Sequence, residues 1–241
     1  MIDLHCHILS DMDDGPSTME ESVLMVQTAL KEGIDTIVAT SHFTDIKAID
    51  SYLASRDEKI DSLLGTLSEK GIKADIVKGA EVYIDMGLFD INGIERLALN
   101  GSRYILTELP MMAFPLYTEE FLYRLQLLGL IPIIAHPERN ERIIRDPELL
   151  YRLVDLGSLA QINTGSITGL FGTASQKCAR KILKSKMAHI IATDAHSNGR
   201  RKPAMIDCIK VLNNWIGQKE TDKLINTAAA ILANRDLNSD Q

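Results

Sequence analysis

The first residues of the chain carry side chains that suit metal chemistry. His5 and His7 stand two residues apart, directly after the apolar start at residues 2–4. In an extended segment alternate side chains point the same way, so both imidazoles can face one ion. The acidic run DMDD at residues 11–14 follows, and Gly15-Pro16 predicts a turn that brings the carboxylates back beside the histidines. The spacing predicts a metal site, although an isolated His-x-His pair is also common at protein surfaces.

Alternating apolar strands and amphipathic helices are predicted along the rest of the chain. Strands are predicted over residues 2–4, 36–40, 74–80, 103–107, 131–135, 158–163 and 189–193. Helices are predicted over residues 17–32, 51–70, 118–128, 146–156, 173–185, 203–215 and 220–234, the first with a capping box in which Ser17 accepts the N–H of Glu20. This alternation predicts a parallel sheet with right-handed crossovers, and about seven strands favour a closed or nearly closed barrel.

Candidate ligands stand at the carboxyl ends of most of these predicted strands. They are His5 with His7, His42, Glu81, Glu108, His136, and Asp194 with His196. In α/β barrels the carboxyl ends of the strands form the catalytic face. Residues scattered for structural reasons would not follow this placement so consistently. The sequence therefore predicts a polynuclear metal site on a single domain that covers residues 1–241.

The composition restricts the class of protein. A chain of 241 residues with 45% hydrophobic residues fits one large domain with a proper core. The net charge of −7 argues against nucleic acid as a partner, because phosphate backbones are bound by excess Lys and Arg. We find no secretory signal pattern and no apolar run long enough for a membrane span, so we expect a cytoplasmic protein without membrane insertion.

The three cysteines are widely spaced, as in a reduced intracellular protein. None of them fits the CxxxxxR pattern of cysteine phosphatases, because the positions of the arginine hold Met12, Lys184 and Asn214. Cys6 alternates with His5 and His7, so its side chain is expected to point away from the site as a buried structural thiol.

Seven motifs together resemble those of the polymerase and histidinol phosphatase (PHP) superfamily of metal hydrolases. In chain order they are HCHILSDMDDGP, TSHF, KGAEVYI, TELP, IAHPERN, QINTGSITGLFG and TDAH. More narrowly they are similar to the bacterial manganese-dependent protein-tyrosine phosphatases of capsule and exopolysaccharide operons. The resemblance covers nearly the whole chain. It implies a distorted (β/α)7 TIM-like barrel, the PHP fold, with the metal site at the carboxyl ends of the strands.

The resemblance also implies a ligand set and a metal. The implied ligands are His5, His7, Asp14, His42, Glu81, Glu108, His136, Asp194 and His196. They would hold three ions, with Glu81 bridging two of them and Asp14, His42 and His196 holding the third. Imidazole and carboxylate donors without a thiolate favour Mn²⁺, Fe²⁺ or Zn²⁺, and the resemblance favours Mn²⁺. Phe43, where many relatives have a second histidine, is expected to alter the rim of the pocket.

The reaction implied by this resemblance is hydrolysis of a phosphoric monoester. Three divalent ions would carry more charge than the four carboxylates neutralise, and the surplus suits a phosphate dianion. A hydroxide bridging two metals would attack phosphorus directly, without a phosphoenzyme and without an assignable general acid. The implied substrate is a phosphotyrosine-containing protein, specifically the C-terminal tyrosine cluster of a bacterial tyrosine kinase that regulates capsular or exopolysaccharide synthesis.

Arginines near the predicted strand ends are candidates for binding phosphate. Arg139 in the HPER motif could grip a phosphate bidentately, and its alternative is a surface ion pair with Glu138 or Glu141. Arg200 and Arg201 are similar candidates. The family pattern favours Arg201, while the sequence leaves open which of the two points inward.

Other functions fit parts of the same pattern. A small-molecule phosphatase, such as a histidinol-phosphate phosphatase, would share the fold, the metals and the mechanism. An amidohydrolase also begins with His-x-His, but needs a metal-bridging lysine where Glu81 or Glu108 stands. A regulatory subunit with an idle barrel would have no need for the intact ligand set. Residues 163–169 either shape the substrate rim or form a turn.

Overall fold

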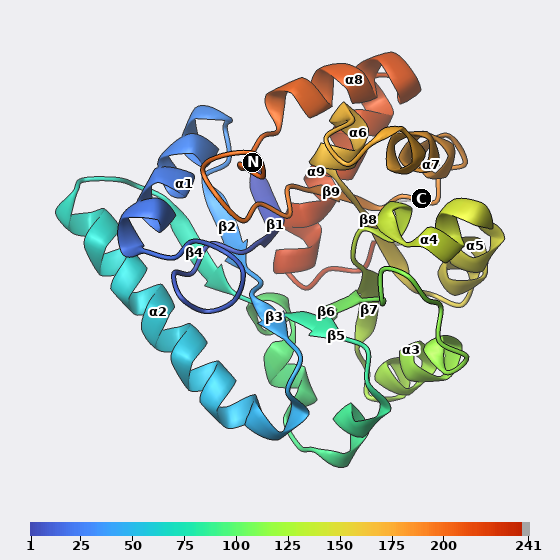
Figure 1. The fold of residues 1–241 in the computed structure, drawn as a ribbon, viewed down its shortest axis with the longest axis horizontal. Coiled ribbons are helices and arrows are strands. Elements are labelled where there is room, and N and C mark those ends of the chain that lie inside the picture. The colour runs from blue at the N-terminus through green and yellow to red at the C-terminus, as the bar shows by residue number, and fades with distance from the viewer. Residues whose placement is uncertain (238–241) are drawn as a thin grey trace.

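Parallel strands form a curled sheet at the centre of the computed structural model, which describes residues 1–237, and helices surround them (Figure 1). The strands are β1 (Ile2–Cys6), β2 (Thr36–Ala39), β3 (His42–Phe43), β4 (Asp75–Lys78), β5 (Glu81–Tyr83), β6 (Tyr104–Glu108), β7 (Ile131–Ile134), β8 (Leu159–Asn163) and β9 (Ile190–Ala192). Their pairing follows the orders β1-β2-β4 and β3-β5-β6-β7-β8-β9. Every pair is parallel, as the alternating pattern predicts.

Two short interruptions divide predicted strands into separate segments. Residues 40–41 separate β2 from β3, and residues 79–80 separate β4 from β5. Because β3 pairs with β5 just as β2 pairs with β4, the two sets of strands continue one another. A Cβ atom at Gly79 would lie 2.6 Å from Val38 Cγ1, so the close approach of the two segments before Glu81 requires glycine.

Hydrogen bonds join the first strand to the segment after the last one. Cys6 forms a parallel bridge with Ala195. The N–H of Asp194 donates to the carbonyl oxygen of His5 at 2.8 Å, and the N–H of His7 donates to that of Ala195 at 2.8 Å. The curl of the sheet therefore brings the segment after β9 next to β1.

Nine α-helices lie around the strands of the described chain. They are α1 (Met19–Lys31), α2 (Ile49–Glu69), α3 (Thr118–Leu127), α4 (Glu141–Arg145), α5 (Glu148–Asp155), α6 (Thr164–Thr168), α7 (Thr173–Lys184), α8 (Ile206–Ile216) and α9 (Gln218–Leu232). The predicted cap of α1 is wrong by one residue. Thr18, with extended backbone, accepts the N–H of Glu21 at 3.2 Å, while the Glu21 carboxylate accepts the N–H of Ser17.

The predicted α/β class with a curled, barrel-like parallel sheet is confirmed. The count of seven strand–helix units stays a prediction, since residues 85–101 between β5 and β6 contain only the 3-10 helices η2 (Met86–Asp90), η3 (Ile94–Leu97) and η4 (Leu99–Gly101). The single domain over residues 1–241 also stays a prediction, and residues 238–241 lie outside the described part. Within residues 1–237, no helix is both long and apolar enough to cross a membrane.

A cluster of buried apolar side chains from several strands forms part of the core near the candidate ligands. It includes Leu4, Val38, Leu106, Ile133 and Ile190, each from a different strand, and all are at most 1% exposed. The pairing register of β1 shifts between Asp3 and Cys6, next to His5. Such irregularities re-aim side chains, so the cluster and the imidazole of His5 can both be buried along one short strand.

Candidate metal centre

The nine predicted ligands come together at one end of the sheet, at or after the carboxyl ends of β1, β6, β7 and β9 and at the start of β3 and β5, which follow β2 and β4. They are supplied by β1 and the loop after it (His5, His7, Asp14), by β3 (His42), β5 (Glu81) and β6 (Glu108), and by the residues after β7 (His136) and β9 (Asp194, His196). His136 and Asp194 have positive backbone φ angles of 32° and 52°. Such backbone conformations are strained in residues other than glycine and are often found at functional sites.

Glu81 lies at the centre of this cluster and is fully buried. Its Oε2 atom lies 3.2 Å from Nε2 of both His5 and His7. The same oxygen lies 3.1 Å from His42 Nδ1, and Oε1 lies 3.0 Å from His136 Nε2. Oε2 nevertheless accepts no hydrogen bond of acceptable geometry from any of the described residues. A cation between the imidazole nitrogens and this buried oxygen would satisfy the unpaired Oε2 atom.

The candidate ligands form four overlapping groups. Within each group, one ligand atom from every residue lies within 4.8 Å of those of the other members. The groups are His7, Asp14, His42 and His196; His5, His7 and Glu81; His5, His136 and Asp194; and His42, Glu81 and Glu108. Together they comprise the same nine residues that the sequence predicts. Shared donors between neighbouring groups fit several adjacent ions better than one isolated ion.

The carboxylates of the cluster stabilise the protonated, positively charged form of two buried imidazoles. Burial lowers the pKa of His5, but the carboxylates of Glu81 and Asp194 outweigh burial and raise this pKa to about 9. For His7 the carboxylates of Asp13 and Glu81 likewise outweigh burial and raise the pKa to about 10. Divalent ions would supply the same positive charge, so this mixture of nitrogen and carboxylate donors fits borderline transition metals.

Asp13 is a supporting residue that could not be distinguished from its acidic neighbours by sequence alone. Its Oδ2 atom lies 2.6 Å from His7 Nδ1 and accepts the backbone N–H of His42 at 2.8 Å. This contact fixes the His7 ring so that Nε2 faces Glu81. The carboxylate run in DMDDG was a visible signal, but neighbouring acids could not be assigned different roles without the loop geometry.

Two amide side chains on β8 support a further pair of candidate ligands. Gln161 Oε1 lies 2.9 Å from His5 Nδ1, and Gln161 Nε2 donates to Asn163 Oδ1 at 2.8 Å. Asn163 Nδ2 in turn donates to Asp194 Oδ2 at 2.6 Å. The chain of contacts orients both His5 and Asp194, although β8 supplies no candidate ligand itself. In the sequence, the only indication was that two polar residues alternate with Ile162 at the end of a predicted buried strand.

Replacing Gln161 by Leu is expected to weaken metal binding about 10–100-fold, the usual cost of losing an outer partner of a ligand. Leucine has a similar volume but cannot accept a hydrogen bond from His5 Nδ1–H or donate one to Asn163. Calorimetric titration of the metal-free protein with Mn²⁺ measures the change. Gln218→Leu, at an exposed position on α9, is the matched control. Equal affinities in the two variants would leave Gln161 without a supporting role.

Two arginines meet at the edge of the cluster. Arg139 Nη1 and Arg201 Nη2 lie 2.7 Å and 2.8 Å from the same oxygen, Asp194 Oδ2. Their guanidinium carbons lie 4.2 Å and 5.8 Å from the centre of the Phe171 ring. The alternative of an Arg139 ion pair with a neighbouring glutamate is wrong. Arg200 instead donates to the carbonyl oxygen of Leu170 at 3.3 Å.

A pocket of about 600 Å³ opens beside Arg139. Its lining includes Met111, Leu170, Phe171 and Arg200. Gly169, the last residue of the NTGSITG segment, also lines this pocket, while residues 164–168 form α6. A role of the segment in shaping the substrate rim stays a prediction. The expected effect of Phe43 on the rim is wrong. Its side chain is 2% exposed and packs on Tyr52 with ring centres 5.1 Å apart.

Comparisons with known proteins agree along almost the whole chain. The family model for capsular polysaccharide synthesis, CpsB/CapC, matches residues 1–233. The tyrosine-protein phosphatase YwqE of Bacillus subtilis (strain 168) is 36% identical over 236 residues, which are 98% of this chain and 92% of YwqE. The tyrosine-protein phosphatase CpsB of Streptococcus pneumoniae is 30% identical in an alignment that covers 93% of this chain and 94% of CpsB.

Solved structures give the same result. A crystal structure from work on YwqE of Bacillus subtilis and CpsB of Streptococcus pneumoniae, described as unique metal-dependent tyrosine phosphatases, matches with a TM-score of 0.91 and 35% identity. The match covers 98% of this chain and 96% of that one. A D-hydantoinase structure matches with a TM-score of 0.59 at 12% identity, which shows a likeness of fold alone. The chain belongs to the CpsB/CapC family of capsular polysaccharide synthesis.

Proposed function

We propose that this protein is a metal-dependent protein-tyrosine phosphatase. The observation that supports this proposal most strongly is the Glu81-centred cluster of nine nitrogen and carboxylate donors, beside two arginines that meet at Asp194. The activity agrees with the tyrosine-protein phosphatases that are similar to this chain over nearly its full length. It also agrees with the metal dependence of the structural relative.

Three Mn²⁺ ions are the proposed cofactors, with Fe²⁺ or Zn²⁺ as substitutes. The ions would be held by His5, His7, Asp14, His42, Glu81, Glu108, His136, Asp194 and His196. When bound, such ions polarise the phosphoryl oxygens and provide a water of lowered pKa for direct hydrolysis. The supporting argument is the donor set, in which four carboxylates leave room for net positive charge that attracts a phosphate dianion.

The side chains around the cluster would bind and orient the phosphorylated tyrosine. Arg139 and Arg201 carry fixed charges next to the candidate ligands and suit the oxygens of a phosphate. Phe171 lies beneath both guanidinium groups and lines the pocket, where it can pack against an aromatic ring. Because Cys6 is fully buried and burial raises the pKa of its thiol well above the usual range, a cysteine nucleophile is not part of this proposal.

The proposed partner is a phosphotyrosine-containing protein. The narrower proposal is the C-terminal tyrosine cluster of a bacterial tyrosine kinase that regulates capsular or exopolysaccharide synthesis, which fits membership in a capsule-synthesis family. A cytoplasmic location is proposed on the basis of the three free, buried cysteines. The net charge of −7 is consistent with a partner other than nucleic acid.

Phosphotyrosine peptides are expected to be hydrolysed at least about tenfold more efficiently than phosphoserine peptides of the same sequence. An aromatic pair contributes about 0.5–1.5 kcal/mol, and a phenolate leaves more readily than a serine alkoxide. Release of inorganic phosphate by the Mn²⁺-loaded protein gives kcat/KM for each substrate. Histidinol phosphate is the competing substrate in the same assay. A higher kcat/KM for histidinol phosphate would favour a small-molecule phosphatase and overturn the proposal.

A further inference from the structure

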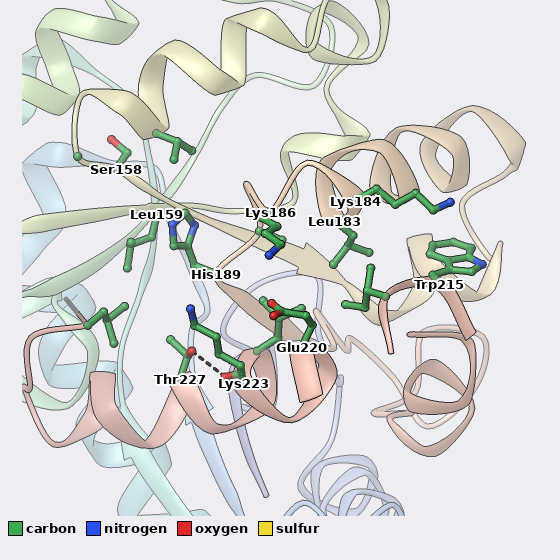
Figure 2. Close-up of a pocket in the computed structure, with 16 residues that line it drawn as sticks. Ser158, Leu159, Leu183, Lys184, Lys186, His189, Trp215, Glu220, Lys223 and Thr227 are labelled. Carbon is green, nitrogen blue, oxygen red and sulfur yellow. Dashed lines mark hydrogen bonds between the residues drawn. The ribbon is translucent and has the colours of Figure 1, made fainter. Parts of the chain in front are cut away.

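A second pocket lies at the opposite end of the strands from the metal centre. It has a volume of about 650 Å³ and lies where β8 and β9 begin, between α5, α7, α8 and α9 (Figure 2). Binding pockets for small molecules commonly have volumes of about 300–1,000 Å³. The pocket shares no lining residue with the cluster around Glu81, so the proposed phosphatase reaction does not account for it.

Apolar side chains from four elements form much of the pocket wall. Leu159 comes from β8, Leu183 from α7, Trp215 from α8 and Leu224 from α9. Trp215 is half-buried, and the guanidinium carbon of Arg180 lies 5.4 Å from the centre of its ring. This wall can cover the aromatic or alkyl body of a ligand.

Three lysines also line this pocket, Lys184, Lys186 and Lys223, and Glu220 is the acid among the lining residues. Figure 2 shows Lys184 on the side of Trp215, whereas Lys186 and Lys223 lie nearer His189. Lys78 forms an ion pair with a carboxylate at 2.6 Å, whereas none of the three pocket lysines has an ion-pair partner among residues 1–237. In a chain with a net charge of −7, this local excess of positive charge favours an anion as the occupant.

His189 reports the same local charge. Its Nδ1 atom accepts the N–H of Ala160 at 3.1 Å, so the neutral ring carries its proton on Nε2. Figure 2 shows Lys223 extending from α9 toward His189. Burial and the positive charge of Lys223 lower the pKa of His189. The imidazole is therefore neutral near pH 7, and the lysines provide the charge that faces a ligand.

We infer that this pocket binds a small organic anion. The apolar body lies against Leu183 and Trp215, and the carboxylate, sulfonate or phosphate lies by Lys186 and Lys223. The combination of an apolar wall with a few convergent charged groups is typical of small-molecule sites.

Trp215 is the single tryptophan of the chain, so its fluorescence reports directly on this pocket. The Mn²⁺-loaded protein is titrated with octanesulfonate below its micelle concentration, and separately with octyl glucoside and sodium sulfate. The expected result is a saturable change in Trp215 emission with octanesulfonate. The response to octyl glucoside, which has no charge, and to sodium sulfate, which has no apolar chain, should be much weaker. No saturable change, or equal binding of octyl glucoside, would overturn the inference.

Charge reversal tests the role of the lysines. Lys186→Glu with Lys223→Glu is expected to weaken octanesulfonate binding about tenfold or more, because two cations facing the anion become carboxylates. Lys73→Glu with Lys177→Glu, at exposed positions outside the pocket, is the matched control. Both double variants should hydrolyse 4-nitrophenyl phosphate at the wild-type rate, which verifies the fold. Unchanged octanesulfonate affinity in the Lys186/Lys223 variant would contradict an anion site.

Discussion

Complete chelation of divalent ions is expected to reduce phosphotyrosine hydrolysis to background, and added Mn²⁺ is expected to restore it. Glu81, Glu108, His5 and His136 are largely buried around one centre, and without cations their donor atoms offer no electrophile to a phosphate. Divalent ions held by these residues would stabilise the negative charge of the transition state by several kcal/mol. Phosphate release from a phosphotyrosine peptide, before and after chelation, measures the effect.

Cys6→Ser provides the control for this experiment. Cys6 is 0% exposed and belongs to the main hydrophobic core, and its Sγ lies 3.7 Å from the carbonyl oxygen of Ala195. The variant should therefore retain both its metals and its activity. Activity that survives chelation, or that disappears in Cys6→Ser with full metal content, would indicate a thiol mechanism instead.

The second large effect is expected from His136→Ala. Its Nε2 atom lies 3.0 Å from Glu81 Oε1, and it belongs to the group formed with His5 and Asp194. Loss of a direct ligand should exceed the about 10–100-fold cost of losing an outer partner. Metal content by elemental analysis and kcat/KM should therefore fall together. Full metal content with full activity would remove His136 from the proposed site.

Arg139→Ala is the matched comparison, because it removes charge without removing a ligand. Asp194 Oδ2 keeps its contacts with Arg201 at 2.8 Å and with Asn163 at 2.6 Å, so Asp194 stays oriented. Metals should remain, while kcat/KM falls by about ten- to a hundredfold, as expected for about 1.5–3 kcal/mol from a charge-assisted hydrogen bond. Wild-type kcat/KM in this variant would show that Arg139 serves only as the ion-pair partner of Asp194.

The positions of the candidate ligands were predictable because strand topology places them. His42 and Glu81 follow the apolar strands β2 and β4 after a short break, and Glu108 is the last residue of β6. Parallel strands bring such positions to one end of the sheet. Local patterns therefore implied a long-range arrangement. Short-range details were less accessible, as the cap of α1 shows, where Ser17 and Thr18 offered two overlapping capping patterns.

The supporting contacts could not be derived in the same way. Gln161 and Asn163 act through hydrogen bonds to residues 156 and 31 positions away, and polar residues in a buried strand have many alternative partners. Phe171 becomes relevant only because α6 turns the chain back toward the arginines. The pocket beside Trp215 is assembled from distant helices whose sequence pattern indicates no more than amphipathic packing.

Anomalous diffraction from crystals grown with Mn²⁺ tests the central claim most directly. The claim is that the nine side chains around Glu81 hold the ions on which phosphotyrosine hydrolysis depends. The account predicts manganese peaks within this cluster, with Glu81 next to two of them, in protein from a preparation that hydrolyses a phosphotyrosine peptide. An active preparation whose crystals show no manganese peak beside His5, Glu81 and His136 would contradict the account.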